Sequence, residues 1–199
     1  MGKAKRRERA FWQQFGQEQQ EKIRVFYEQG YPLPPINILK TEEQIEGIRK
    51  SSQLTKSLLD ELETVIKPGM TTDDINTWVH TRTIESGALP APLNYRGFPK
   101  SICTSLNEVI CHGIPSSRVL ADGDILNVDI TCILDGYYGD SCRMYQIGDV
   151  SPSAKKLVTV AKECLEIGIQ AVVPYQPLNV IGEAIEAHAH QNGFSVVEM

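Results

Sequence analysis

The sequence predicts an α/β protein of the α+β kind, in which pairs of helices accompany antiparallel strands, and three observations carry this prediction. Apolar residues recur at helical spacing in several segments, two other segments are rich in β-forming residues, and a tight Asp-Gly turn lies between two of the predicted strands. The chain of 199 residues is 41% hydrophobic and 23% charged, which is an ordinary composition for one or two folded domains.

Start and stop signals predict the helices. The capping-box sequence TEEQ opens an amphipathic helix over about 41–65, and KPGMTTDD ends it and caps a second helix over about 73–86. Two more helices are expected over about 154–172 and 178–191. Between the two pairs, strand-like segments cover 101–111 and 124–146.

The second pair of helices repeats the first. Three matched positions lie 106 residues apart, namely Pro68 and Pro174, Ile75 and Ile181, and Gly87 and Gly193. Either the chain contains an internal repeat, or two helical hairpins merely look alike. About sixty residues with the predicted strands follow the first copy, whereas six residues follow the second, so we expect the second copy to lack its sheet in this chain.

The stretch ILNVDITCILDGYYGDSC predicts a β-hairpin with an aspartate in each arm. With Asp-Gly as the turn, Thr131 faces Asp140, and Asp129 lies diagonal to Asp140 on the same face. Two converging carboxylates share a proton or hold a cation, and oxygen ligands favour hard or borderline divalent metals. The other interpretation is that Asn127, Asp129 and Thr131 form the solvated face of an ordinary sheet. The hairpin alone favours this second interpretation, because polar outer faces are the usual case.

Charge and cysteine content limit the other possibilities. A net charge of -5 argues against a general nucleic-acid binder, although five of the first ten residues, MGKAKRRERA, are basic. That tail is either a contact for RNA, a ribosome or an acidic partner, or a solvated segment. No apolar run is long enough for a membrane span and none resembles a signal peptide, so we expect a cytoplasmic protein. The five cysteines lack CxxC spacing and are expected to be reduced thiols.

Domain boundaries follow from composition. Residues 1–40 form a basic and Gln-rich extension that ends in the proline-rich segment YPLPPIN, and residues 41–199 form the folded domain.

Three motifs resemble type I methionine aminopeptidase, namely YRGFPKSICTSLNEVICHGIP, DGDILNVDITCILDGYYGDSCRMY and GFSVV, and the resemblance extends from about residue 41 to the last residue. This family has the pita-bread fold, in which two pseudo-symmetric α/β halves surround a dinuclear metal centre, and it removes the initiator methionine from nascent proteins. The resemblance implies a first half that is complete and a second half that is incomplete at its C-terminus.

The resemblance also implies roles for single residues. Asp129 and Asp140 match two metal ligands, and Asp140 would bridge both ions. His112 matches a histidine that hydrogen-bonds the scissile amide or the tetrahedral intermediate; taken alone, it would be a loop histidine with a structural hydrogen bond.

The methionine pocket of the family corresponds to Tyr95, Phe98 and Cys103, with His112 beside it. Aromatic walls and a soft sulfur suit an unbranched thioether, although these three residues taken alone would be ordinary core residues.

The implied cofactors are two divalent metal ions (Co, Mn, Fe or Zn), which would activate a water molecule and anchor the free α-amine of the substrate. The remaining family ligands are a histidine in a GHGIG-like motif and two glutamates, and none is present, so this chain carries two of five ligands and is expected to be inactive by itself. His188 and His190 do not replace them, because residues two apart on a helix point to different sides; both are expected at the surface.

Two alternatives accompany this interpretation. One is a non-catalytic half-fold that serves as a binding or interaction module, and the other is a related pita-bread peptidase that acts on Xaa-Pro bonds. The segment CHGIP and the pocket position of Cys103 fit the methionine enzyme better.

Overall fold

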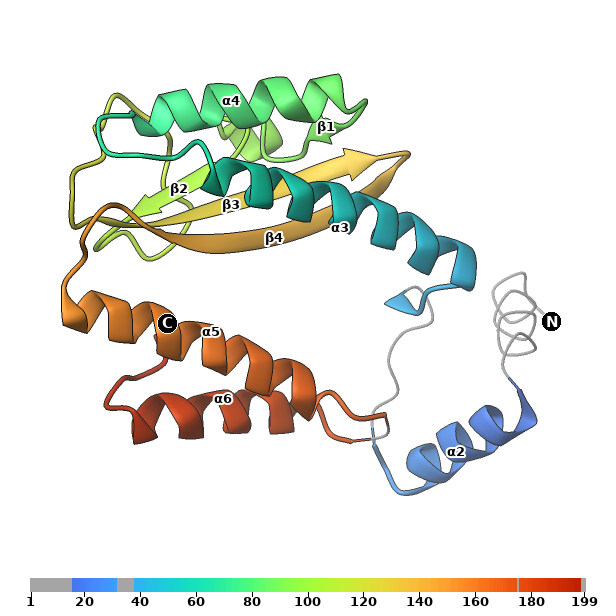
Figure 1. Ribbon diagram of the computed structural model, residues 1–199. Coiled ribbons are helices and arrows are strands. Elements are labelled where there is room, and N and C mark those ends of the chain that lie inside the picture. Colours follow the sequence, from blue (N-terminus) through green and yellow to red (C-terminus); the bar gives the residue numbers. More distant parts are fainter. Residues whose placement is uncertain (1–15, 32–37, 175, 198–199) are drawn as a thin grey trace. The chain divides into compact units, whose positions relative to one another are not determined.

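The computed structural model of the protein describes residues 16–31, 38–174 and 176–197, and contacts divide the chain into two units, residues 1–47 and 48–199 (Figure 1). The basic run at the start and most of the proline-rich segment lie outside the described residues. The first unit contains helix α2 (Gln17–Glu28), on which Lys22 and Glu18 form an ion pair of 2.7 Å one helical turn apart.

The predicted helices are all present. They are α3 (Glu42–Glu63), α4 (Thr72–Glu85), α5 (Pro152–Ala171) and α6 (Asn179–Gln191). The short 3-10 helix η2 (Tyr95–Gly97) was not predicted. The predicted capping box opens α3, because the Thr41 N–H donates to Gln44 Oε1 over 3.0 Å and the Gln44 N–H donates to Thr41 Oγ1 over 3.3 Å.

One antiparallel sheet is built around a central strand. Its strands are β1 (Leu89–Pro90), β2 (Cys103–Leu106), β3 (Ile125–Leu134) and β4 (Tyr137–Gln146). Strand β3 pairs with β4 along its whole length and with β1 and β2 on its other side. The predicted hairpin register is confirmed, since Thr131 lies opposite Asp140 and Cys132 opposite Gly139.

Two features of the sheet differ from the prediction. Strand β1 was not predicted, because two residues that include a proline carry no strand signal. The first strand-like segment was expected over 101–111, but β2 ends at Leu106. The Asn107 N–H still donates to the Ile125 carbonyl, but Asn107 adopts a left-handed backbone (φ 51°), and its side-chain Oδ1 accepts from the Ile125 N–H while its Nδ2 donates to Asp124, so the strand ends there.

Helices α3 and α4 cover one face of the sheet (Figure 1). Strand β3 alternates between buried and half-buried residues, so only one of its faces belongs to the core. The buried core includes Leu58, Leu62, Ile75, Val79, Leu126, Val128, Ile130 and Cys132. The polar face of β3 that carries Asp129 therefore lies on the side of the sheet away from α3 and α4.

Helix α3 approaches the hairpin closely at Gly139. Ser51 Oγ donates to the Cys132 carbonyl over 3.1 Å, and Thr55 Oγ1 donates to the Gly139 carbonyl over 2.8 Å. A Cβ atom built on Gly139 would lie 2.3 Å from the carbonyl carbon of Ser51, so no side chain fits there. This contact fixes β4 directly beside Asp140.

We expect Gly139→Ala to destabilise the fold by about 1–3 kcal/mol, the usual cost of overpacking, because helix and strand backbone would have to separate. Gly182→Ala is the matched control, since a Cβ atom there meets nothing within 4 Å on helix α6 and alanine favours the helix. Urea unfolding of both variants measures the difference. Equal midpoints would show that the close approach does not limit stability.

The two helix pairs end in the same way, which supports the internal repeat. Gly87 (φ 76°) follows α4 and the Ala88 N–H donates to the Thr83 carbonyl over 3.1 Å; Gly193 (φ 81°) follows α6, and the Phe194 N–H donates to Ala189 over 2.9 Å. Helices α5 and α6 pack on each other at Gly168, where a Cβ atom would come within 2.9 Å of Ile185.

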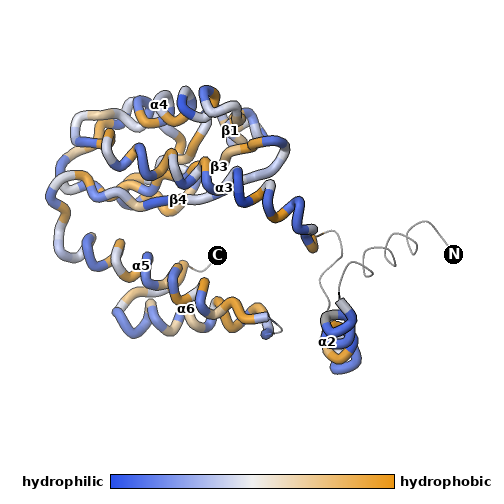
Figure 2. The backbone as a smooth tube through the Cα atoms, turned by 45° about the vertical axis from the view of Figure 1, so that its right-hand side comes forward, coloured by the Kyte–Doolittle hydropathy of each residue, from blue (hydrophilic) through white to orange (hydrophobic). Residues whose placement is uncertain are grey.

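The described residues contain no strand after β4. Figure 2 shows apolar residues along α5 and α6, and several of these side chains are exposed on the helices and in the turn that joins them. They include Leu165, Ile169, Val172, Val173 and Leu178. None of the helices in the described part of the chain combines the length and apolarity needed to cross a bilayer.

The prediction for the two α6 histidines was right for His190, which is exposed, and wrong for His188. His188 is half-buried because its Nε2 lies 2.7 Å from Glu163 Oε2 on helix α5. The pair links the two helices and leaves His188 outside the acidic hairpin.

Candidate metal and catalytic site

Two carboxylates converge on the face of the hairpin that points away from α3 and α4. Asp129 lies on β3 and Asp140 on β4, one diagonal step apart in the register. Thr131 Oγ1, directly opposite Asp140, donates a hydrogen bond of 3.0 Å to Asp140 Oδ1. Strand pairing that is set by the Asp-Gly turn thus brings the two acids together, and the Thr131 hydroxyl orients one of them.

Electrostatics indicate that the two acids interact. Partial burial raises the pKa of the Asp129 carboxyl, and the negative charge and hydrogen bonding of Asp140 raise it further, whereas His112 opposes the shift. A cation between the two carboxylates would remove this repulsion. Two convergent carboxylates are a donor set that fits a divalent ion. In the described part of the chain, however, no group of three or more His, Cys, Asp or Glu side chains gathers to hold a metal.

His112 lies near enough to Asp129 to influence the pKa of its carboxyl, and it stands in an unusual loop. Its backbone is left-handed (φ 53°), and the next residue, Gly113, lies flat against β2. The Thr104 N–H donates to the Gly113 carbonyl over 2.8 Å, and the Gly113 N–H donates to Ser105 Oγ over 3.1 Å. A Cβ atom on Gly113 would lie 2.1 Å from the Thr104 carbonyl oxygen, so only glycine permits this approach.

Cys103 belongs to the same site. It lies opposite Asp129 in the register of β2 and β3 and is buried. Burial first, and then the nearby Asp129, Cys111 and Asp140, raise the pKa of its thiol to about 11. Cys103 therefore presents a neutral, soft sulfur beside the acids at physiological pH.

Cys111 is a neighbour that sequence reasoning did not single out. It is exposed, precedes His112 and lies close enough to Cys103 to affect the pKa of that thiol. No sequence signal marks this contact, because it depends on the path of the loop back to β2.

Tyr95 and Phe98 lie on one turn before β2. The Phe98 N–H donates to the Tyr95 carbonyl over 2.9 Å, and the guanidinium of Arg96 lies 5.4 Å from the centre of the Tyr95 ring. Tyr95 is 63% exposed, so the interpretation of this residue as an ordinary core residue is wrong, whereas Phe98 is half-buried. Their role in a methionine pocket stays a prediction.

Two convergent carboxylates with a histidine nearby are groups that a metal-dependent hydrolase can use. The model of metallopeptidase family M24 matches residues 46–198, and the chain belongs to that family.

Its similar relatives are methionine aminopeptidases. The chain is 52% identical over 160 residues to methionine aminopeptidase A of Synechocystis sp., which covers 80% of this chain and 63% of the relative. It is 46% identical over 158 residues to the human mitochondrial methionine aminopeptidase 1D, covering 79% of this chain and 47% of that protein. The crystal structure of methionine aminopeptidase from Rickettsia prowazekii matches with a TM-score of 0.79 and 45% identity, covering 80% of this chain and 64% of that one. The chain thus spans less than two thirds of these relatives.

Xaa-Pro peptidases are more distant. The X-Pro aminopeptidase of Thermotoga maritima matches with a TM-score of 0.67 at 20% identity, covering 78% of this chain and 43% of that one, and this likeness shows the fold alone. The fold is accordingly the pita-bread arrangement, present here in part.

Proposed function

We propose that this chain supplies part of the active site of a methionine aminopeptidase that removes the initiator methionine from nascent polypeptides in the cytoplasm. The observation that carries the proposal is the convergence of Asp129 and Asp140 on one face of a hairpin, with His112 beside them. The identity to named methionine aminopeptidases favours this reaction over cleavage of Xaa-Pro bonds.

Each site residue has a distinct proposed role. Asp129 and Asp140 hold two divalent ions (Co, Mn, Fe or Zn), and such ions, when bound, supply Lewis-acid chemistry to peptide hydrolysis. His112 donates a hydrogen bond to the scissile group, where charge develops during the reaction. Because burial keeps the Cys103 thiol neutral, we assign it with Tyr95 and Phe98 to the pocket for the methionine side chain.

The proposed partner is the free N-terminus of a nascent polypeptide. Contact of the basic segment at the start of the chain with a ribosome or RNA is a further proposal, supported by its five basic residues among the first ten.

A chimera tests the proposed reaction. We expect the 199-residue chain alone to show no cleavage of Met-Gly-Met, because the described residues offer no third metal ligand beside the two acids. The chain fused to the part of the Synechocystis relative that the alignment leaves uncovered should cleave Met-Gly-Met and leave Ala-Pro peptides intact, with Co, Mn, Fe or Zn supplied. Cleavage of Ala-Pro peptides instead would favour the Xaa-Pro reaction, and activity of the chain alone would contradict the shared site.

A further inference from the structure

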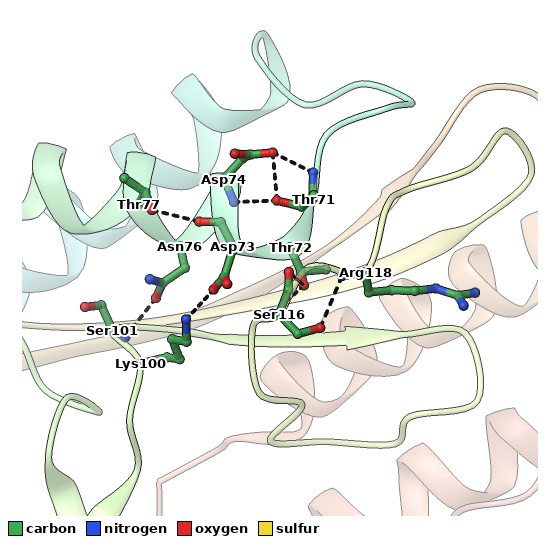
Figure 3. A network of polar contacts seen from close by, with 10 residues as sticks. All are labelled: Thr71, Thr72, Asp73, Asp74, Asn76, Thr77, Lys100, Ser101, Ser116 and Arg118. Atoms are coloured by element: carbon green, nitrogen blue, oxygen red, sulfur yellow. Dashed lines mark hydrogen bonds and ion pairs between the residues drawn. The ribbon is translucent and has the colours of Figure 1, made fainter.

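Both loops that flank β2 lead back to one end of helix α4. The segment before β2 carries Tyr95 and Phe98, and the loop after β2 carries His112. Figure 3 shows side chains of the first two turns of α4 directed at residues of both loops.

The His112 loop is bonded to the first turn of α4. The N–H groups of Thr72 and Asp73 donate to the carbonyls of Arg118 and Ser116 over 3.0 and 2.9 Å. Thr72 Oγ1 also donates to the Ser116 carbonyl over 3.0 Å and accepts from the Ser116 N–H over 2.9 Å. The first N–H groups of a helix have no intrahelical partners, and here two of them donate to carbonyls of the loop.

The segment before β2 is bonded to the next turn. Asn76 Oδ1 accepts from the Ser101 N–H over 2.9 Å, and His80 Nδ1 lies 2.8 Å from Ser101 Oγ. Lys100 forms an ion pair with the Asp73 carboxylate. Ser101 is 3% exposed and stands two positions before Cys103, so its backbone position sets where β2 begins.

We expect the hydrogen bonds of Thr72 and Asn76 to contribute more than the ion pair. The Lys100 and Asp73 side chains are 28% and 40% exposed, and an ion pair at that exposure contributes little. Thr72 is 3% exposed, and its hydroxyl is the acceptor of the Ser116 N–H, so loss of the hydroxyl removes a hydrogen bond that is shielded from water on the Thr72 side. Thr72 and Asn76 are therefore the residues whose loss should move the loops.

We propose that Thr72 and Asn76 are positioning residues of the active site: Thr72 fixes the loop that carries His112, and Asn76 fixes the segment that leads to Cys103. The first two turns of α4 are a common anchor for the histidine and the pocket. Their role in catalysis rests on the proposed function, whereas their hold on the loops does not.

Hydrogen exchange of the full chain, resolved by peptide mass spectrometry, tests Thr72. We expect Thr72→Val to speed exchange in residues 111–118 by about fivefold or more, because the Ser116 N–H loses its acceptor, while exchange in β3 and β4 stays unchanged. Thr72→Ser keeps the hydroxyl and should restore protection. Thr83→Val is the matched control, since Thr83 is also buried on α4 but its hydroxyl donates to the Val79 carbonyl and contacts Cys132 of β3, not the loop. A change no larger than that of the control, or one spread evenly over the chain, would overturn the proposal.

Asn76 provides a second test, since it is only half-buried and its replacement spares the core. Asn76→Ala should speed exchange in residues 99–103, and Asn76→Asp, which keeps an acceptor oxygen, should rescue it. Absence of this local change would overturn the role of Asn76.

In the chimera, Thr72→Val should lower kcat on the order of tenfold with KM nearly unchanged, whereas Asn76→Ala should mainly raise KM. If both variants lowered kcat and raised KM by similar factors, the role of Thr72 and Asn76 would be merely structural. A chimera without activity would refute the proposed function and leave the exchange results as the measure of positioning.

Discussion

Asp129→Asn is expected to abolish divalent-ion binding at the hairpin and to bring turnover of the chimera below detection, while the fold stays intact. The amide is a weak, neutral ligand in place of a carboxylate. Asp129 lies on the face of β3 that does not enter the core, and partial burial and Asp140 raise the pKa of its carboxyl, so the fold does not depend on its charge. Asp140→Asn should have the same effect, since its carboxylate faces the same spot.

Paramagnetic Mn²⁺ measures this prediction in the chain itself. Weakly bound Mn²⁺ should broaden the amide signals of residues near Asp129 and Asp140 in the parent protein and leave them sharp in the variants. Asp135→Asn is the matched control on the same hairpin, because Asp135 is exposed in the turn and asparagine tolerates its left-handed backbone (φ 51°). If Mn²⁺ broadened the same amide signals equally in Asp129→Asn, Asp129 would not be a metal ligand.

The hairpin was predictable because its signals are local. The Asp-Gly turn and the alternation of β3 fix the register, and the register alone places Asp129 and Asp140 on one face. The same signals left the metal interpretation less favoured than a solvated face, since sequence alternation does not report charge repulsion. The resemblance of the surrounding motifs to methionine aminopeptidases changed that preference. In the structure, the raised pKa of the Asp129 carboxyl reflects the repulsion between the two acids.

The rest of the site depends on contacts between distant segments. The Gly113 carbonyl bonds the Thr104 N–H, and no propensity in either segment predicts that His112 will return to β2 at this point. The anchor at Thr72 pairs with Ser116, 44 positions away, through a hydroxyl that the sequence marks only as a residue at the start of a helix. His188 is another example, because it was predicted at the surface, whereas its contact with Glu163 on α5 leaves it half-buried.

The position of His112 determines what its loss should do. Gly113 and the anchor at Thr72 hold its loop independently of the imidazole, and neither contact uses the His112 side chain. Removal of the ring should therefore leave the loop and both acids in place. A hydrogen-bond donor that pairs mainly with the transition state affects kcat more than it affects substrate binding.

We expect His112→Ala to lower kcat of the chimera on the order of 10²-fold or more with a smaller change in KM, because one preorganised donor is lost where charge develops. Ion binding, followed by Mn²⁺ broadening around Asp129 and Asp140, should persist. His190→Ala is the matched control, since His190 is exposed on α6 and should leave kcat unchanged. Loss of ion binding in His112→Ala would make His112 a ligand instead of a donor. A rise in KM with kcat preserved would instead assign His112 to substrate binding, because a group that binds substrate and transition state equally well changes KM and not kcat.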